Sequence, residues 1–186
     1  MGTVGWIILG VVILLLLWAV GVYNKLIRLR NNCDEGFSTM DVYMKKRFDL
    51  IPNLVETVKG YAKHESSTLE KVIAARSNGL AASTPEEKMA SSNQISGALR
   101  QLFALSEAYP DLKANTNFQD LQNQLKAVEN DIANSRKYYN AVVKDYNTQI
   151  QVVPSNIVAN LTGFKAKPMF IVDDETERKA VKVSFE

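Results

Sequence analysis

Residues 4–23 read VGWIILGVVILLLLWAVGVY, a stretch without a single charged side chain. An α-helix rises about 1.5 Å per residue and the hydrocarbon core of a bilayer is about 30 Å thick, so about 20 apolar residues cross it. Trp6 and Trp18, the only tryptophans of the chain, lie near the ends of this stretch, where indole rings favour the membrane interface. The stretch therefore predicts one transmembrane helix, with the lipid bilayer as its partner.

A cleavable signal peptide is the alternative interpretation of this stretch. It requires a basic residue before the apolar core and a cleavage site between small residues. No Lys or Arg precedes residue 4, and only Ala19 and Gly21 resemble such a site. These flanks favour a retained anchor over residues 1–24.

The basic residues beside the anchor predict its orientation. Lys25, Arg28 and Arg30 follow the apolar stretch, and no basic residue precedes it. Because Lys and Arg accumulate on the cytoplasmic side of a membrane span, the C-terminal domain is expected in the cytoplasm.

Composition narrows the class of the remaining chain. The protein has 186 residues and a net charge of +2, which leaves about 160 residues after the span, enough for one domain with a core. Basic residues are interleaved with acidic ones, so no nucleic-acid surface is predicted. The local cluster Lys45, Lys46 and Arg47 is expected on a solvated face, with contact to anionic headgroups as the alternative if the helix folds back.

Apolar residues after the span recur at intervals of three and four, the period of amphipathic helices. The first helix is expected to continue directly out of the membrane. Its predicted buried stripe is Leu26, Leu29, Cys33, Phe37, Met40, Met44 and Ile51. Pro52 lacks a backbone donor, so it should kink or end this helix near Leu50.

Three further helices are predicted. One carries Val55, Val58, Ala62, Leu69 and Val72 and ends near Gly79 with a left-handed glycine cap. The next begins at Ser83 or Thr84, followed by Pro85, Glu86 and Glu87, and carries Met89, Ile95, Leu99, Leu102, Phe103 and Ser106. The last runs over residues 117–150, with the stripe Phe118, Leu121, Leu125, Val128, Ile132, Ser135, Tyr139, Val142, Tyr146 and Ile150.

These stripes, joined by short loops, predict an all-α fold: an N-terminal transmembrane helix followed by an antiparallel helical bundle with coiled-coil-like packing over residues 25–163. Residues 151–156 should break the last long helix, residues 157–161 could form one short turn, and Gly163 should end it. An extended tail over residues 164–186 follows. Its weak alternation at 180–185 suits packing on the bundle or pairing with another chain.

The sequence contains few residues that could carry out catalysis. His64 is the only histidine and is expected on the polar face near the middle of a helix. Cys33 is the only cysteine and is read as a small buried hydrophobic residue. Because no acid, base and nucleophile converge and no phosphate-binding glycine pattern occurs, we predict no catalytic, cofactor-binding or metal-binding residues and no enzyme.

Three groups of carboxylates are candidates for pairing: Asp34 with Glu35, Asp41 with Asp49, and Asp173 with Asp174 and Glu175. Asp41 and Asp49 each lie four residues from Lys45, which favours an ion-pair ladder over an acid–base couple. The group at 173–175 is interpreted as a solvated turn. A divalent cation is the weaker alternative there, because oxygen ligands without a loop pattern are unspecific.

Five segments of the chain carry a resemblance to a known family. Residues 41–62 read DVYMKKRFDLIPNLVETVKGYA, and the others are YNKLIRLRN at 23–31, YPDLKAN at 109–115, DYNT at 145–148 and PSNIVA at 154–159. Together they closely resemble the LemA family over nearly the whole chain. Phe37, where the family often has Trp, is a small departure.

The resemblance implies an N-terminally anchored bacterial protein with a helical-bundle domain and no established enzymatic activity. It places the span in the bacterial inner membrane. Family members are often encoded near membrane zinc proteases, and a magnetosome branch is associated with internal membrane vesicles. No catalytic residues come with the family, so none is transferred.

Two function classes follow from the sequence. The preferred hypothesis is a single-pass scaffold whose copies form a homo-oligomer that organises or shapes the membrane. The alternative is a monomeric adaptor that presents its bundle to a membrane protease or another envelope protein.

Overall fold

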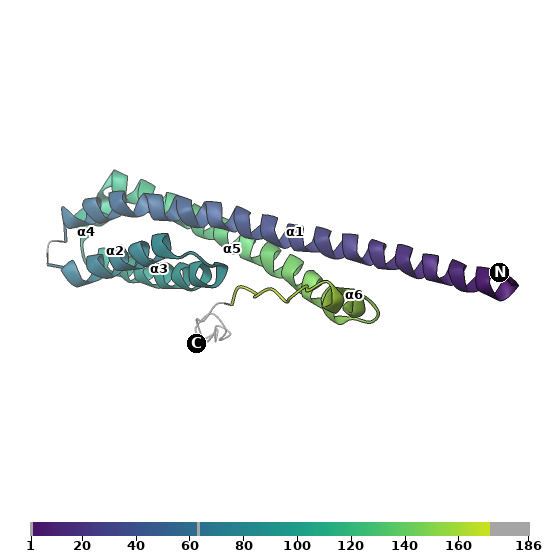
Figure 1. Cartoon of the computed structure of the whole chain (residues 1–186). Coiled ribbons are helices and arrows are strands. Elements are labelled where there is room, and N and C mark those ends of the chain that lie inside the picture. The colour runs from purple at the N-terminus through teal and green to yellow at the C-terminus, as the bar shows by residue number, and fades with distance from the viewer. Residues whose placement is uncertain (1, 63, 172–186) are drawn as a thin grey trace, which may run out of the picture. The chain divides into compact units, whose positions relative to one another are not determined.

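The computed structural model describes residues 2–62 and 64–171, and within these ranges it contains helices and no strand. The helices are α1 (Thr3–Lys59), α2 (Ser66–Ala81), α3 (Pro85–Ser106), α4 (Pro110–Ala114), α5 (Thr116–Gln151) and α6 (Ser155–Leu161) (Figure 1). The prediction of an all-α fold is confirmed. In the described residues, α1 alone is long and apolar enough to cross a membrane, judged by length and composition, and none of its apolar window is buried.

The chain divides into two compact units. The described part of the first unit covers residues 2–43 and 129–169, so it holds the first part of α1, the second part of α5, and α6. The second unit covers residues 44–128 with residues 170 and 171 and holds the rest of α1 and α5 together with α2, α3 and α4. The sequence-based division at residues 24 and 163 stays a prediction.

The core of the first unit follows the predicted period. Its fully or nearly fully buried side chains are Leu26, Cys33 and Met40 on α1 and Ile132, Tyr139, Val143, Tyr146 and Ile150 on α5. Val143 is buried where Val142 was expected, and Val142 lies half-buried. A Cβ on Gly36 would be 3.5 Å from Val142 Cγ2 and 3.3 Å from the ring of Tyr138, so glycine permits a close approach of the two helices here.

Of the two outcomes predicted for Pro52, a kink or the end of the first helix near Leu50, the second is wrong, because α1 continues through Pro52 to Lys59. A proline cannot donate to the carbonyl four residues earlier, which is that of Phe48. Arg76 supplies the missing donor, since its Nε donates to the Phe48 carbonyl at 2.8 Å. The backbone cost of the proline is thus offset by a side chain from α2.

The second predicted helix is also corrected. Val55 and Val58 belong to α1, whereas Leu69 and Val72 belong to α2, and the chain turns between the two helices. The N–H groups of Tyr61 and Ala62 both donate to the carbonyl of Val58, which closes the end of α1.

The prediction that Gly79 caps α2 in a left-handed conformation is wrong. Gly79 lies buried within the helix. A Cβ at this position would stand 2.4 Å from Cζ of Phe48, so the ring occupies the space of the absent side chain. The helix continues past Gly79 to Ala81. Gly79 therefore makes room for the packed ring and does not end the helix.

The start of α3 confirms the predicted cap. Thr84 is the N-cap, its hydroxyl accepts from the N–H of Glu87 at 3.2 Å, and the Glu87 carboxylate accepts from the N–H of Thr84 at 3.1 Å. This reciprocal capping box satisfies donors that a helix start otherwise leaves open. A short helix, α4, lies in the connection between α3 and α5, where only a short loop was predicted.

The end of the last long helix is confirmed as well. The helix α5 ends at Gln151, a cis peptide joins Val153 to Pro154, and α6 follows. Gly163 has φ +77°, a left-handed conformation that suits glycine, and it terminates this region.

Candidate functional site

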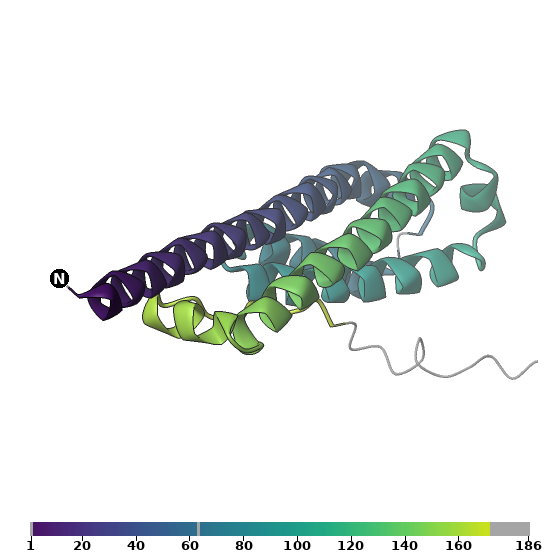
Figure 2. The same ribbon diagram turned by 90° about the vertical axis from the view of Figure 1, so that its right-hand side faces the viewer.

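The segment after α6 lies in extended form against α5 within the first unit (Figure 2). Asn147 holds its backbone at Lys167 from both sides: Asn147 Nδ2 donates to the Lys167 carbonyl, and the Lys167 N–H donates to Asn147 Oδ1, each at 2.9 Å. A side-chain amide offers one donor and one acceptor at this spacing, so it mimics a neighbouring strand. We call residues 164–168 the tail strap.

Two tyrosines of α5 hold the tail strap on either side of this contact. Tyr146 Oη donates to the Lys165 carbonyl at 2.8 Å, and Tyr139 Oη donates to the Pro168 carbonyl at 2.9 Å. Both rings are buried, and burial raises the pKa of Tyr146 above its ordinary value. The hydroxyl of Tyr146 thus remains a donor at physiological pH.

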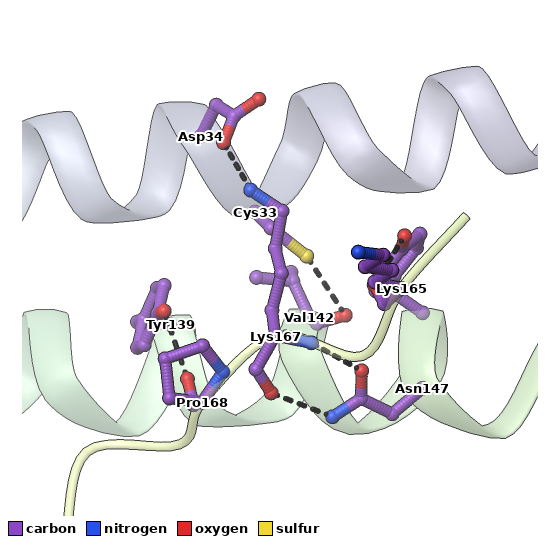
Figure 3. A network of polar contacts seen from close by, with 9 residues as sticks. Cys33, Asp34, Tyr139, Val142, Asn147, Lys165, Lys167 and Pro168 are labelled. Carbon is purple, nitrogen blue, oxygen red and sulfur yellow. Dashed lines mark hydrogen bonds and ion pairs between the residues drawn. The ribbon is translucent and has the colours of Figure 1, made fainter. Parts of the chain in front are cut away.

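An ion pair joins the tail strap to α1, as Figure 3 shows, where Lys167 Nζ lies against Asp34 Oδ1. Nearby, the Cys33 thiol donates to the carbonyl of Val142 at 3.4 Å. Burial raises the pKa of Cys33, so the unreactive thiol form predominates. The interpretation of Cys33 as a small buried hydrophobic residue is confirmed by its zero exposure.

The strap begins with an aromatic cluster at the end of the apolar stretch. The Phe164 ring lies edge-on to Tyr23 with centroids 5.8 Å apart and edge-on to Tyr146 at 6.4 Å. The Arg30 guanidinium stands 5.4 Å from the same ring, a cation–π contact. The last residue of the predicted span is therefore packed directly on the folded first unit.

A buried arginine organises the second unit. Arg47 is fully buried, and its guanidinium donates to Ser96 Oγ at 2.9 Å, to Ser92 Oγ at 2.8 Å and to the Ser92 carbonyl at 3.2 Å. The expectation of a solvated face is therefore wrong for Arg47, whereas Lys45 and Lys46 are exposed. A run of basic residues does not reveal which of them faces inward. The burial of Arg47 is instead indicated by the spacing of three and four that places it in one stripe with Met40, Met44 and Ile51.

The outer face of α2 carries exposed apolar residues. Ile73 and Leu80 are exposed on α2, and Ala74 and Ala81 beside them are exposed too. Residues seven apart return to the same side of a helix, which is the spacing of a coiled-coil seam. We call Ile73 and Leu80 together the α2 outer face.

The other candidates from the sequence do not gather into a site. His64 lies exposed in the turn between α1 and α2, not in the middle of a helix as predicted. Asp49 is exposed on α1, and Asp34 pairs with Lys167. Over residues 2–62 and 64–171, no three His, Cys, Asp or Glu side chains are placed to hold a metal ion. The carboxylates at 173–175 and the alternation at 180–185 lie outside the described residues.

Known proteins match this chain over most of its length. A model described as the LemA family matches residues 36–185. Protein LemA of Metamycoplasma hominis is 28% identical over 84% of this chain and 75% of its own length. Magnetosome protein MamQ 2 of Paramagnetospirillum magneticum is 25% identical, and magnetosome protein MamQ of Magnetospirillum gryphiswaldense 24%; each match covers 80% of this chain.

The share of each relative that is matched decides which of its properties can be assigned to this chain. This chain spans 64% of the length of the two magnetosome relatives, slightly under two thirds. None of the relatives' names denotes an enzyme.

Proposed function

Because this chain belongs to the LemA family, we propose that it is a single-pass membrane protein whose helical part self-associates into a scaffold that organises or shapes the membrane. The observation that carries this proposal is the continuity of α1. The helix leaves the apolar stretch at Tyr23 without a break, and Leu26, three residues later, is already fully buried in the first unit.

This continuity has a mechanical consequence for an anchored protein. A flexible linker would let a domain reorient freely over the bilayer, whereas an unbroken helix with one buried face fixes the direction in which the first unit leaves it. The contact between Tyr23 and Phe164 adds a second attachment at the same level. Copies held in one orientation present equivalent surfaces to each other, which favours ordered assembly in the plane of a membrane.

The α2 outer face supports self-association. Ile73 and Leu80 are large aliphatic side chains exposed seven residues apart, a spacing that buries well against the same face of a second copy. Relatives named as magnetosome proteins are in line with a role at a membrane.

The proposed location is the bacterial inner membrane, with the helical part in the cytoplasm. Lys25, Arg28 and Arg30 on one side of the span support this orientation. Cys33 is buried and cannot report the side, so the test uses a Ser38→Cys variant in a Cys33→Ala background, at an exposed position of α1. A membrane-impermeant maleimide should label it only after the cells are permeabilised. Labelling in intact cells would contradict the cytoplasmic assignment.

A monomeric adaptor is the second candidate function, and the same α2 outer face would then receive a membrane protease or another envelope protein. The mass of the detergent-extracted full-length protein separates the two candidates. Light scattering coupled to size exclusion, with the detergent subtracted, should give a discrete multiple of 20.8 kDa for the scaffold. A monomer would favour the adaptor.

Matched variants sharpen this measurement. Ile73→Ser with Leu80→Ser should reduce the particle mass if the α2 outer face joins the copies. Val42→Ser is the control, because Val42 is an aliphatic residue with 63% exposure that belongs to α1 and not to the α2 outer face. An unchanged mass in the double variant would exclude the α2 outer face as the contact.

A further inference from the structure

The turn between α5 and α6, together with α6, exposes a group of large aliphatic side chains. They are Val152, Val153, Ile157 and Leu161, and the exposed fractions of Val153 and Leu161 reach 78% and 83%. Such exposure is more than scattered surface hydrophobicity, because all four residues fall within ten positions of sequence. We call these four residues the α6 apolar patch.

The patch is held in place by the fold and is not a frayed end. Ser155 Oγ donates to the carbonyl of Gln149 at 2.7 Å and accepts from Gln149 Nε2 at 2.8 Å, which ties the start of α6 to the end of α5. One face of α6 is buried through Ser155, Val158 and Ala159. Ile157 and Leu161, four residues apart, share the opposite face.

The patch lies at the level where the predicted span ends. The N–H of Phe164 donates to the carbonyl of Ala159 at 3.0 Å, so the backbone of Phe164 is tied to α6. The Phe164 ring packs on Tyr23, the last residue of the apolar stretch, with centroids 5.8 Å apart. Both views show α6 beside α1 within the first unit (Figures 1 and 2).

Charge around the patch is arranged as a membrane surface would require. Residues 151–164 contain no charged residue, although 23% of the whole chain is charged. Cationic side chains adjoin this uncharged region: Lys165 follows it in sequence, and Arg30 of α1 contacts the ring of Phe164 at its end. Lys25 and Arg28 lie within the same two turns of α1 as Arg30. Aliphatic side chains enter the boundary between headgroups and acyl chains, while Lys and Arg near the surface attract anionic headgroups.

We propose that the α6 apolar patch inserts into the headgroup region of the leaflet from which α1 emerges, as a second membrane contact. This inference rests on the proposed anchoring by residues 4–23, because only then does Tyr23 mark the bilayer surface. The lipid-exposed surface of the span and the patch then form one continuous apolar surface. The first unit is held against the membrane at two points, which fixes its tilt as well as its direction.

Quenching by lipid tests the insertion in the full-length chain. Leu161→Cys in a Cys33→Ala background is labelled with an environment-sensitive fluorophore and reconstituted into vesicles of phosphatidylcholine and phosphatidylglycerol that contain spin-labelled lipid. Leu161 is so exposed that the change leaves the packing of α6 intact. Val42→Cys is the matched control, since it lies about 28 Å beyond Tyr23 at about 1.5 Å per residue.

The outcomes separate the patch from the anchor. Trp6 and Trp18, the only tryptophans, report the span in the same vesicles. Insertion predicts quenching of the tryptophans and of the label on Leu161→Cys, with none on Val42→Cys. Quenched tryptophans with an unquenched Leu161→Cys label, or equal quenching at both labels, would overturn the insertion while the anchor stands. Unquenched tryptophans would overturn the anchor and the insertion with it.

Discussion

The guanidinium of Arg76 donates from Nε to the backbone carbonyl of Phe48 at 2.8 Å, and this is the carbonyl that Pro52 leaves without its helical partner. A residue of α2 thus stabilises an irregular position in α1, 28 positions apart in sequence from its partner. The pair explains why a proline is tolerated inside a helix that runs to Lys59.

Removal of this donor should destabilise the protein. Arg76→Met keeps much of the side-chain stem but leaves the Phe48 carbonyl unsatisfied, and we expect a loss of about 1–3 kcal/mol in the free energy of unfolding. Denaturant unfolding of the full chain in mild detergent, followed by circular dichroism, measures it. Pro52→Ala restores a backbone donor, so Arg76→Met should cost less in that background. Equal costs in the two backgrounds would exclude the compensation.

Gly79 should not tolerate a side chain. The Cβ of a Gly79→Ala variant would stand 2.4 Å from Phe48 Cζ, and Phe48 is itself buried, so we expect overpacking to cost about 1–3 kcal/mol. The matched control is Gly97→Ala in α3, where a Cβ meets nothing within 4 Å. That change should stabilise the helix by about 0.5–1 kcal/mol. The same unfolding assay compares them, and a stabilised Gly79→Ala variant would show that the ring moves aside freely.

The capping box of α3 should make stability depend on pH. The N–H groups of Ser83 and Thr84 donate to the Glu87 carboxylate and hold its pKa below the ordinary value. Because the folded pKa is the lower one, this stabilisation is fully present above the unfolded pKa, about 4.3, and is lost as the pH falls through the folded value.

The measurement compares wild type with Glu87→Gln, which keeps a hydrogen-bond acceptor without the charge. The wild type should be the more stable protein at neutral pH, and the difference should vanish in strong acid. Glu86→Gln, in the same first turn, is the control. A difference between wild type and Glu87→Gln that does not change with pH would contradict a role of the charge.

The tail strap should be released when its amide clamp is removed. Asn147→Ala deletes both hydrogen bonds to the backbone of Lys167 and is expected to cost about 1–2 kcal/mol of local stability. Trypsin should then cleave faster after Lys165, as mass spectrometry of timed digests can show, whereas the bond after Lys167 resists trypsin because Pro168 follows it. Asn134→Ala, an exposed asparagine on the same helix, should leave the rates unchanged. Equal cleavage of the Asn147→Ala variant and wild type would mean that the tyrosines suffice.

Local signals in the sequence predicted a large part of this fold. The N-cap at Thr84 and the helix end at Gly163 depend on neighbours a few positions away, and both predictions are confirmed. The period of three and four predicted most of the buried stripes, since Leu26, Cys33 and Met40 lie inside. Leu29, Phe37 and Val142, which were assigned to the same stripes, are half-buried.

Long-range partners account for what the sequence did not reveal. Arg47 donates hydrogen bonds to Ser92 and Ser96, which lie more than forty positions away, so these partners could not be inferred from the sequence around Arg47. The same holds for Pro52, whose tolerance depends on Arg76. The docking of the strap required knowing that Asn147 faces the chain at Lys167. Each of these contacts exists only once the helices are packed.

Self-association in a bilayer is the central claim, and counting subunits there tests it most directly. The full chain, fused at its C-terminus to a fluorescent protein, is reconstituted at low density in vesicles, and photobleaching steps are counted for each spot. The account predicts several steps per spot for the wild type and fewer for Ile73→Ser with Leu80→Ser. Single-step bleaching of the wild type, indistinguishable from that double variant, would contradict it.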